Sequence, residues 1–463
     1  MQQAVQDLQS RLVDFGQDHV LRYWGQFDLT QQEELVHQLS SIDFEQLRRL
    51  RDHGASETDF SALALKATPP KAFRINEVGE ISSSDARLEG QRLLASGGVG
   101  AVLVAGGQGT RLGFPHPKGM FPVGPVSERS LFQMHVDQLL AISRRYGHSV
   151  PLYLMTSPAT HDETVAYFQQ HDRLGLAEDD LHIFCQGTMP TIDDRGRLML
   201  ESRHRVCVNP DGHGGMLDAF DRSGCLQHAQ SRGIDQLFYF QVDNPLVSVC
   251  DAEFLGYHSL AQSDMSTSVV AKNTPLDPVG NVVSIDDSLQ VIEYIDLPDL
   301  AAERRDEQGR LYLWAGNIAV HTFRWDFLER VAAIDDTLPF HFAHKAVPYL
   351  NELGELVKPS EPNATKFEKF IFDLMPLAHN AIAVEVSQHD QFAPVKNASG
   401  AASDTPESSR AAIVARAKRW LTSVGVEVVD GVQVEIHPSF ALDVDELAKR
   451  VTTDKITADI FLS

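Results

Sequence analysis

The sequence predicts an α/β protein with a mixed, mostly parallel sheet flanked by helices, an N-terminal helical region and a small C-terminal α/β module. Three observations support this fold class. From residue 99 onward, short apolar runs alternate with amphipathic stretches of helical length. The first 70 residues repeat apolar positions at helical spacing instead. A further amphipathic helix and short apolar runs follow a polar stretch at 396–412.

The N-terminal helical region is expected to span residues 1–95. Thr30 begins a T-Q-Q-E sequence that predicts a capping box with Glu33. A Pro-Pro pair at 69–70 ends the first helical pattern, and 85–96 predicts another helix. Apolar residues at near-helical spacing are Leu29, Leu35, Leu39 and Phe44.

The central region, residues 96–390, contains the alternating pattern. Amphipathic segments such as SLFQMHVDQLLAISRRYG and HDETVAYFQQHD separate its apolar runs. Strands separated by helices of this length indicate βαβ units, whose right-handed crossovers place ligands at the carboxyl ends of the strands. The predicted strands are VGAVLVA, VPLYLMT, LHIFCQ, LFYFQVDN and MSTSVVAK, followed by NVVSI, LQVIEYI and YLWAGNIAVHTF, some of them antiparallel.

The C-terminal region, residues 391–463, begins close to KNASGAASDTPESSRAA, which on composition predicts a linker or mobile loop at 396–412. AAIVARAKRWLTSVG then predicts an amphipathic helix, and the remainder a small α/β module.

Acidic residues outnumber basic ones by 64 to 40, which gives a net charge of −24. Such a charge disfavours binding to nucleic acid or to an anionic membrane, whereas a small anionic substrate fits if Lys and Arg gather in one cleft. The four cysteines lack C-x-x-C spacing and are expected to be reduced thiols rather than disulfides or zinc ligands. With a polar start and no apolar run of about 20 residues, the sequence predicts a soluble cytoplasmic protein.

A glycine-rich turn at 102–120, VLVAGGQGTRLGFPHPKGM, follows the first predicted strand of the central region. Its G-x-G-x-x-x-G spacing is one residue too long for the dinucleotide fingerprint, and no G-K-[ST] follows at Walker spacing. Backbone N–H groups at Gly106 and Gly107 suit phosphate oxygens or a base edge. Arg111 adds a planar fork of donors, and Lys118 adds a point charge. The alternative is a tight strand–helix turn with solvated basic residues.

This loop, followed by P-K-G-M, resembles the signature of the eukaryotic-type UDP-sugar pyrophosphorylases, most nearly the UDP-N-acetylhexosamine pyrophosphorylases. The resemblance covers residues from about 20 to 412. It implies a Rossmann-like, GT-A-like nucleotidyltransferase that transfers a uridylyl group from UTP to a sugar 1-phosphate and releases pyrophosphate, using Mg²⁺. Segments that match in order are FDLTQQEELVHQLSSIDF, NPDGHGG, FQVDNPLV, DPVGNVV, VIEY, AGNIAVH, LPFHFAHKAVP, KFEKFIFDLMP and FAPVKNASGAASDTPESSR.

The residue chemistry agrees with nucleotidyl transfer. An in-line displacement at phosphorus is promoted mostly by positioning and by electrostatic stabilisation, which calls for Lys, Arg and a divalent ion. Arg111 and Lys118 would act on the leaving pyrophosphate. Asp243 follows the strand LFYFQV, at the edge where ligands bind, and a carboxylate suits Mg²⁺. The alternative is that Asp243 only starts a turn.

For the uracil, the resemblance implies Gln186 and Gly212, because a Gln amide and a backbone group match the donors and acceptors of its edge. The turn reads D-G-H-G-G where the family usually has N-G-N-G-G, so His213 replaces an Asn that contacts the sugar or ribose. Without the resemblance, the turn would equally be structural.

The remaining site residues are carried over by resemblance. Glu293, Asn317 and Gly280 correspond to residues that contact the sugar. Lys366 corresponds to the lysine on the sugar-linked phosphate, and Lys396 lies in an F-x-P-x-K run that related uridylyltransferases use. The alternative for Glu293 is a solvated residue on a strand, and the alternative for Lys366 is a position on a charged helix face. The resemblance makes 396–412 an expected flank of the active site.

The leading hypothesis is therefore uridylyl transfer to N-acetylglucosamine 1-phosphate, with UTP and the sugar 1-phosphate as partners. The nearest alternatives are glucose or galactose 1-phosphate, or a broad specificity for sugar 1-phosphates, since pocket shape decides the sugar. A non-catalytic nucleotide-sugar-binding protein would not require Arg111, Lys118 and Asp243 together. A dehydrogenase is excluded by the glycine spacing and by the lack of a suitable acidic residue.

Overall fold

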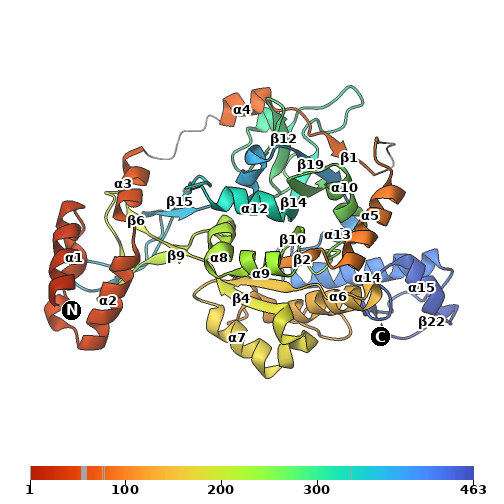
Figure 1. The fold of residues 1–463 in the computed structure, drawn as a ribbon, viewed down its shortest axis with the longest axis horizontal. Coiled ribbons are helices and arrows are strands. Elements are labelled where there is room, and N and C mark those ends of the chain that lie inside the picture. The colour runs from red at the N-terminus through yellow and green to blue at the C-terminus, as the bar shows by residue number, and fades with distance from the viewer. Residues whose placement is uncertain (1, 54–59, 76, 78, 335) are drawn as a thin grey trace. The chain divides into compact units, whose positions relative to one another are not determined.

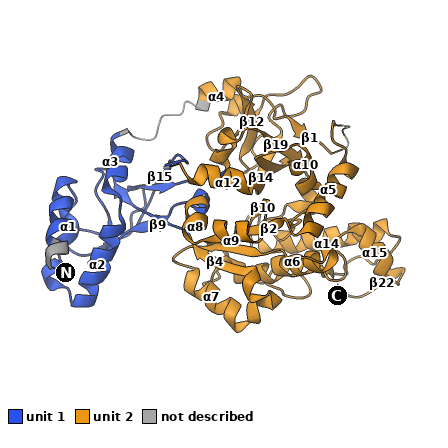
Figure 2. Cartoon of the chain, in the orientation of Figure 1, with its two compact units in different colours: residues 1–59, 186–216, 336–371 blue, residues 60–185, 217–335, 372–463 orange. Residues whose placement is uncertain are grey.

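The computed structural model describes residues 2–53, 60–75, 77, 79–334 and 336–463. The chain divides into two compact units (Figure 2). Unit 1 comprises residues 1–59, 186–216 and 336–371, and unit 2 comprises residues 60–185, 217–335 and 372–463. The boundaries at 95 and 390, drawn from composition, stay predictions.

A ten-stranded sheet lies at the centre of unit 2 in the described part of the chain (Figure 1). Its strands follow the order β1 (Ala72–Phe73), β19 (Ala381–Glu385), β11 (Met265–Ala271), β14 (Ala315–Arg324), β10 (Gln236–Gln241), β2 (Val99–Val104), β3 (Leu152–Thr156) and β4 (Leu181–Cys185). The hairpin β12 (Asn281–Ile285) and β13 (Ser288–Ile292) pairs with β14. All eight runs expected to be strands from residue 99 onward are strands.

The sheet is mixed and mostly parallel, as predicted. β10, β2, β3 and β4 are parallel neighbours, whereas β14 runs antiparallel between β11 and β10. Because parallel strands end at one edge, the residues that follow β2 and β10 come close together. That edge carries the glycine-rich loop and Asp243.

The main core of unit 2 lies between the sheet and its helices. It consists of buried side chains of β2, β3, β10 and the helices α5 and α6. α5 and α10 lie side by side (Figure 1), since a Cβ on Gly90 would lie 1.7 Å from the Ala252 carbonyl oxygen. These central helices are α5 (Ser83–Ser96), α6 (Leu131–Tyr146), α7 (His161–Gln170) and α10 (Ala252–Leu260). The shorter helices are α4 (Phe60–Lys66), α8 (Met216–Arg222), α9 (Cys225–Ser231), α11 (Asp299–Ala302), α12 (Trp325–Ala332) and α13 (Gln388–Gln391).

Unit 1 packs three helices against small antiparallel sheets. Leu35, Leu39 and Phe44 are buried in its core together with Phe367, whereas Leu29 begins a helix and is exposed. Its helices are α1 (Gln2–Asp14), α2 (Leu29–Ser41) and α3 (Phe44–His53). Its strands are β15 (His341–Lys345), β18 (Ala364–Glu368), β6 (Ile192–Asp193), β5 (Thr188–Pro190), β9 (Val208–Pro210), β7 (Leu200–Ser202), β8 (Arg205–Val206), β16 (Tyr349–Leu350) and β17 (Leu356–Val357).

The predicted capping box of Thr30 and Glu33 is wrong. The N-cap of α2 is Asp28, two residues before the predicted Thr30. The Gln31 N–H donates to Asp28 Oδ1 at 2.9 Å, and the Asp28 N–H donates to Gln31 Oε1 at 3.3 Å. Aspartate is among the strongest N-cap residues, and glutamine reciprocates as well as glutamate does.

The C-terminal module belongs to unit 2 and has its own small core. The expected loop at 396–412 is half helix, because Pro406 and the capping box of Thr405 and Ser408 begin α14 inside it. The module contacts the segment before α6 through buried Glu435, whose carboxylate accepts hydrogen bonds from the Val126 and Ser127 N–H groups at 3.0 and 2.8 Å. Its elements are α14 (Pro406–Ser423), α15 (Val444–Arg450) and the parallel pairs β20 (Glu427–Val428) with β22 (Lys455–Ile456) and β21 (Val434–Ile436) with β23 (Ile460–Leu462).

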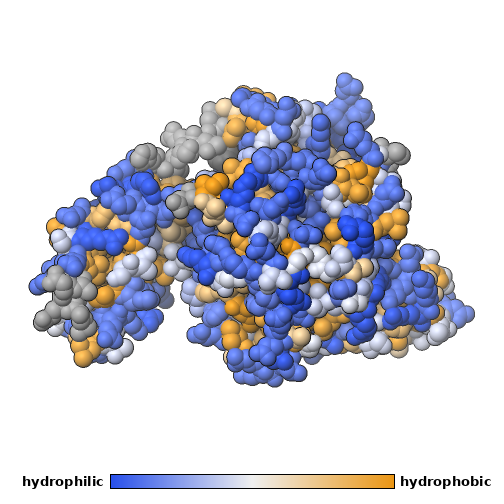
Figure 3. All heavy atoms as spheres, viewed as in Figure 1, coloured by the Kyte–Doolittle hydropathy of each residue, from blue (hydrophilic) through white to orange (hydrophobic). Residues whose placement is uncertain are grey.

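Hydrophilic residues cover most of the face drawn in Figure 3, with hydrophobic residues in scattered patches. All four cysteines are free thiols, as expected. Across the described residues, the search for long apolar helices finds none that could cross a membrane.

Candidate functional site

The glycine-rich loop after β2 is folded back on itself by its own backbone. The Lys118 N–H donates to the Gly107 carbonyl at 3.0 Å, and the Gly109 N–H donates to the His116 carbonyl at 2.8 Å. Two glycines are sterically required, because a Cβ would lie 2.8 Å from Phe114 at Gly109 and 2.2 Å from the Phe132 ring at Gly119. The loop therefore fixes the backbone at Lys118.

Lys118 and Asp243 are brought together by neighbouring parallel strands. The Lys118 Nζ lies 3.8 Å from the Asp243 Oδ2, and the two side chains are only 17% and 13% exposed. The backbone before Asp243 is held by His135 of α6, whose Nε2–H donates to the Val242 carbonyl at 3.0 Å. Burial lowers the pKa of His135 to about 4, so its imidazole is neutral near pH 7. Sequence reasoning missed His135, since a helical histidine has no distinguishing pattern.

Arg111 lies on an exposed 3₁₀ turn, Thr110–Leu112, of the same loop. Gly106 is tied to β3, because its carbonyl accepts a hydrogen bond from the Ser157 hydroxyl at 2.7 Å. The loop therefore presents one fixed cation, Lys118, and one exposed cation, Arg111.

The segment containing Lys396 also meets Asp243. The Val395 N–H donates to the Asp243 carbonyl at 2.8 Å, and the Lys396 N–H donates to the Asp404 carbonyl at 2.7 Å. Burial raises the pKa of the Asp404 carboxyl, and the negative charge of Asp243 raises it further. The positive charge of Lys396 acts in the opposite direction and lowers it. A second carboxylate thus lies near Asp243. Nothing in the sequence indicates this carboxylate, because Asp404 lies in a stretch of small and polar residues typical of a loop.

Gly280, Glu293 and Asn317 form a second group in unit 2, beside the hairpin β12–β13. The Asn317 N–H donates to the Gly280 carbonyl at 2.7 Å. A Cβ on Gly280 would lie 2.9 Å from the Glu293 Oε1, so the Glu293 carboxylate packs directly against this glycine. The structure therefore brings together three of the four residues expected to contact the sugar, the fourth being His213 of unit 1.

Lys272 is a buried cation beside this group. Its Nζ donates to the Asn281 Oδ1, and its side chain passes 3.3 Å from where a Cβ on Gly316 would lie. Burial lowers the pKa of the Lys272 ammonium. Sequence reasoning missed Lys272 because a lysine at the end of a strand, in A-K-N-T-P, is expected to be solvated.

In unit 1, Gln186 and Gly212 meet as expected. The Gln186 Nε2 donates to the Gly212 carbonyl at 3.4 Å and to the Asp211 Oδ1 at 3.3 Å. Gly212 has a φ of +84°, and a Cβ there would lie 2.4 Å from the Lys369 carbonyl oxygen. Close packing against the segment after β18 thus explains this glycine.

His213 lies in the glycine turn next to Gly212, and Lys366 lies in β18, the strand before the segment that packs against this turn. The Ile371 N–H donates to the His213 Nδ1 at 3.2 Å, and the ring stacks on Phe370 with centroids 5.2 Å apart. Burial and the neighbouring charge of His341 lower the pKa of His213 to about 4, so the neutral ring carries its proton on Nε2. Lys366 is part of β18. Just after this strand, the Lys369 carbonyl accepts a hydrogen bond from the Gly214 N–H of the turn at 2.8 Å.

The groups in the two units offer polar atoms of different kinds. In unit 2, cations and carboxylates meet at the carboxyl ends of parallel strands, where phosphates and a divalent ion bind in such sheets. In unit 1, an amide and a glycine turn offer polar groups to a base.

Comparison with known proteins places the chain among nucleotidyltransferases. The family model described as UTP–glucose-1-phosphate uridylyltransferase matches residues 48–446. The UDP-N-acetylhexosamine pyrophosphorylase-like protein 1 of Mus musculus is 36% identical, over 92% of this chain and 88% of that protein. The UDP-N-acetylglucosamine pyrophosphorylase of Saccharomyces cerevisiae is 31% identical, over 96% of each chain.

Solved structures agree with these relatives. The UDP-N-acetylglucosamine pyrophosphorylase of Trypanosoma brucei superposes with a TM-score of 0.83 at 25% identity, covering 100% of this chain and 98% of that one. A putative UDP-N-acetylglucosamine pyrophosphorylase of Entamoeba histolytica gives a TM-score of 0.78 at 29% identity, covering 86% of this chain and 100% of that one. The nucleotidyltransferase fold predicted from the glycine-rich loop is thereby confirmed. The chain belongs to the UTP–glucose-1-phosphate uridylyltransferase family, which contains the UDP-sugar pyrophosphorylases.

Proposed function

We propose that this chain is a uridylyltransferase that forms UDP-N-acetylglucosamine and pyrophosphate from UTP and N-acetylglucosamine 1-phosphate. The observation that carries the reaction is the pairing of Lys118, in the loop after β2, with Asp243, just after the neighbouring parallel strand β10, at 3.8 Å. The sugar is taken from the relatives, since those of Saccharomyces cerevisiae and Trypanosoma brucei are named for UDP-N-acetylglucosamine.

Lys118 and Arg111 act on the leaving group. The phosphate oxygen of the sugar 1-phosphate attacks the α-phosphorus of UTP, and the bond to the pyrophosphate oxygen breaks in line with the attack. Negative charge grows on the pyrophosphate during this step, so fixed cations stabilise the transition state more than the ground state. Lys366 and Lys396 are proposed to hold the attacking phosphate.

Asp243 is the proposed ligand for Mg²⁺. Its carboxylate is partly shielded at the strand end, beside Asp404, and offers hard oxygen atoms. Mg²⁺ bound there would neutralise phosphate charge and orient the triphosphate. Lys118 pairs with the same carboxylate when no metal competes, which holds Asp243 in place.

The other site residues are proposed to recognise the base and the sugar. Gln186 and Gly212 would contact the uracil edge, and the backbone at Gly106 and Gly107 would contact the nucleotide. The sugar contacts are proposed for Gly280, Glu293, Asn317 and the Nε2–H of His213.

A glucose 1-phosphate uridylyltransferase is the second candidate, because the matching family model is named for that activity. The test is release of pyrophosphate by the purified chain from UTP and Mg²⁺, with single sugar 1-phosphates added in turn. The proposal expects release with N-acetylglucosamine 1-phosphate and none without a sugar 1-phosphate. Binding of UDP-sugar without any pyrophosphate release would instead identify a non-catalytic binding protein.

A further inference from the structure

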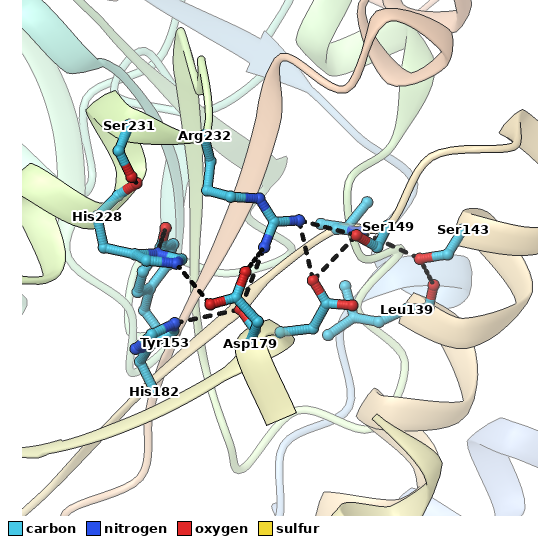
Figure 4. A network of polar contacts seen from close by, with 11 residues as sticks. Leu139, Ser143, Ser149, Tyr153, Asp179, His182, His228, Ser231 and Arg232 are labelled. Atoms are coloured by element: carbon cyan, nitrogen blue, oxygen red, sulfur yellow. Dashed lines mark hydrogen bonds and ion pairs between the residues drawn. The ribbon is translucent and has the colours of Figure 1, made fainter. Parts of the chain in front are cut away.

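Two histidines and an aspartate converge in unit 2, away from the residues discussed above. Asp179 lies just before β4, His182 lies in β4, and His228 lies in α9. One ligand atom from each of these residues lies within 4.8 Å of the others. Figure 4 shows the His228 imidazole directed at the Asp179 carboxylate and the His182 imidazole directed at the Asp179 carbonyl. The cluster is at the beginning of β4, whereas the candidate catalytic residues follow the ends of the parallel strands β2 and β10.

His228 has one nitrogen satisfied and the other directed at the carboxylate. Its Nδ1 lies 2.9 Å from the Tyr153 hydroxyl oxygen, in β3. Its Nε2 is buried, forms no hydrogen bond within the described chain, and lies 3.6 Å from the Asp179 Oδ1. When Nδ1–H donates to Tyr153, the Nε2 lone pair faces the carboxylate oxygen. In that tautomer, two electron-rich atoms face each other 3.6 Å apart, and a cation between them would stabilise the pair.

Arg232 holds Asp179 in the orientation that such a cation needs. Its guanidinium donates to the Asp179 Oδ2 at 2.8 Å and to the Asp179 carbonyl at 3.2 Å. The same guanidinium donates to Asp180 Oδ1 at 3.0 Å and to the Ser149 hydroxyl at 2.9 Å (Figure 4). The Oδ1 of Asp179 is therefore left on the His228 side. Two carboxylates against one guanidinium leave a net negative charge at the cluster.

We propose that Asp179, His182 and His228 form a binding site for Zn²⁺ that is separate from the catalytic site, with Tyr153 as a positioning residue for His228. Two imidazoles and a carboxylate suit Zn²⁺, whereas Mg²⁺ prefers oxygen ligands alone. In a tetrahedral site with Zn–N distances of about 2.0–2.1 Å, neighbouring ligand atoms lie about 3.4 Å apart. The His228 Nε2 and the Asp179 Oδ1 are close to that spacing at 3.6 Å, and all three ligand atoms lie within 4.8 Å of one another.

The surroundings favour occupancy of the site. The His182 Nε2 lies 3.2 Å from the Asp179 carbonyl oxygen, a contact that holds the imidazole beside Asp179. Asp179 is 75% exposed, which gives an ion access from solvent. A bound ion would join α9 to the edge strand β4 and stabilise unit 2 without taking part in the reaction.

The test is titration of the full, chelator-treated chain with Zn²⁺ in millimolar Mg²⁺, which keeps the catalytic carboxylates occupied. The site predicts one tightly bound Zn²⁺ per chain and a rise in Tm. Both are lost in His182→Gln and in His228→Gln. They are kept in His148→Gln, which removes an exposed histidine outside the cluster. Circular dichroism checks that each variant is folded.

Tyr153→Phe separates a positioning role from a structural one. It preserves the ring volume and removes only the oxygen that orients His228, so Zn²⁺ affinity should fall about 10–100-fold with unchanged stoichiometry. The proposal is overturned if the wild-type chain binds no Zn²⁺, which would mean that a proton occupies the His228 Nε2. It is also overturned if both histidine variants retain the wild-type stoichiometry.

Discussion

Replacing Lys118 by Met tests the electrostatic origin of catalysis. The variant keeps most of the side-chain volume and removes one charge, which lies 3.8 Å from the Asp243 carboxylate. At that distance, two unit charges interact by about 4 kcal/mol at an effective dielectric constant of about 20. A phosphate oxygen that replaces the carboxylate as the partner of Lys118 would gain a similar energy. Since part of it is already present in the ground state, kcat should fall about 10²–10³-fold.

The assay measures pyrophosphate release at saturating UTP and N-acetylglucosamine 1-phosphate over a range of Mg²⁺ concentrations. Lys118→Met should lower kcat without raising the Mg²⁺ concentration for half-maximal activity, because Asp243 loses a competing cation. Lys66→Met is the matched control, since it removes a lysine that is paired with Asp286 at 3.4 Å but is 62% exposed. That variant should keep wild-type activity.

Near-wild-type turnover in Lys118→Met would refute the placement of the pyrophosphate at the glycine-rich loop. A raised Mg²⁺ requirement with unchanged kcat at saturation would show that Lys118 supports the metal site instead.

Three further predictions concern the metal, the glycine turn and pH. Asp243→Asn should raise the Mg²⁺ concentration for half-maximal activity, and an unchanged value would remove Asp243 from the metal site. Gly212→Ala should lower the free energy of unfolding in urea by more than Gly431→Ala does, because both glycines have positive φ but only the first meets backbone within 3 Å; equal losses would contradict the packing argument. Burial lowers the pKa of His135 to about 4 and of His258 to about 3, so the unfolded chain takes up protons below pH 6.5 that the folded chain does not. The free energy of unfolding should therefore decrease from pH 7 to pH 5, by up to about 2 kcal/mol per histidine, and an unchanged value would refute this.

The strands and long helices of the central region could be predicted because their patterns are local. Runs such as VGAVLVA are buried on both faces of a parallel sheet, and SLFQMHVDQLLAISRRYG shows one apolar face together with its own cap and terminal glycine. Details that depend on competition between neighbours were not predictable. Asp28 rather than Thr30 caps α2, and α14 begins inside a stretch with the composition of a loop.

The candidate site was predictable where chain order and strand ends determine it. Asp243 follows β10 directly, and the glycine-rich loop that carries Lys118 follows the neighbouring strand β2. His135, Lys272 and Asp404 were missed because their significance comes from burial beside residues distant in the sequence. The roles of the residues taken from family resemblance stay predictions.

The preferred sugar tests the central claim most directly. N-acetylglucosamine 1-phosphate and glucose 1-phosphate, at equal concentration, compete for limiting UTP with Mg²⁺ and the purified chain, and the two UDP-sugars are quantified by mass spectrometry. Their ratio reports the ratio of kcat/KM values. We expect UDP-N-acetylglucosamine to predominate. Predominance of UDP-glucose, or formation of neither product, would contradict the proposed function.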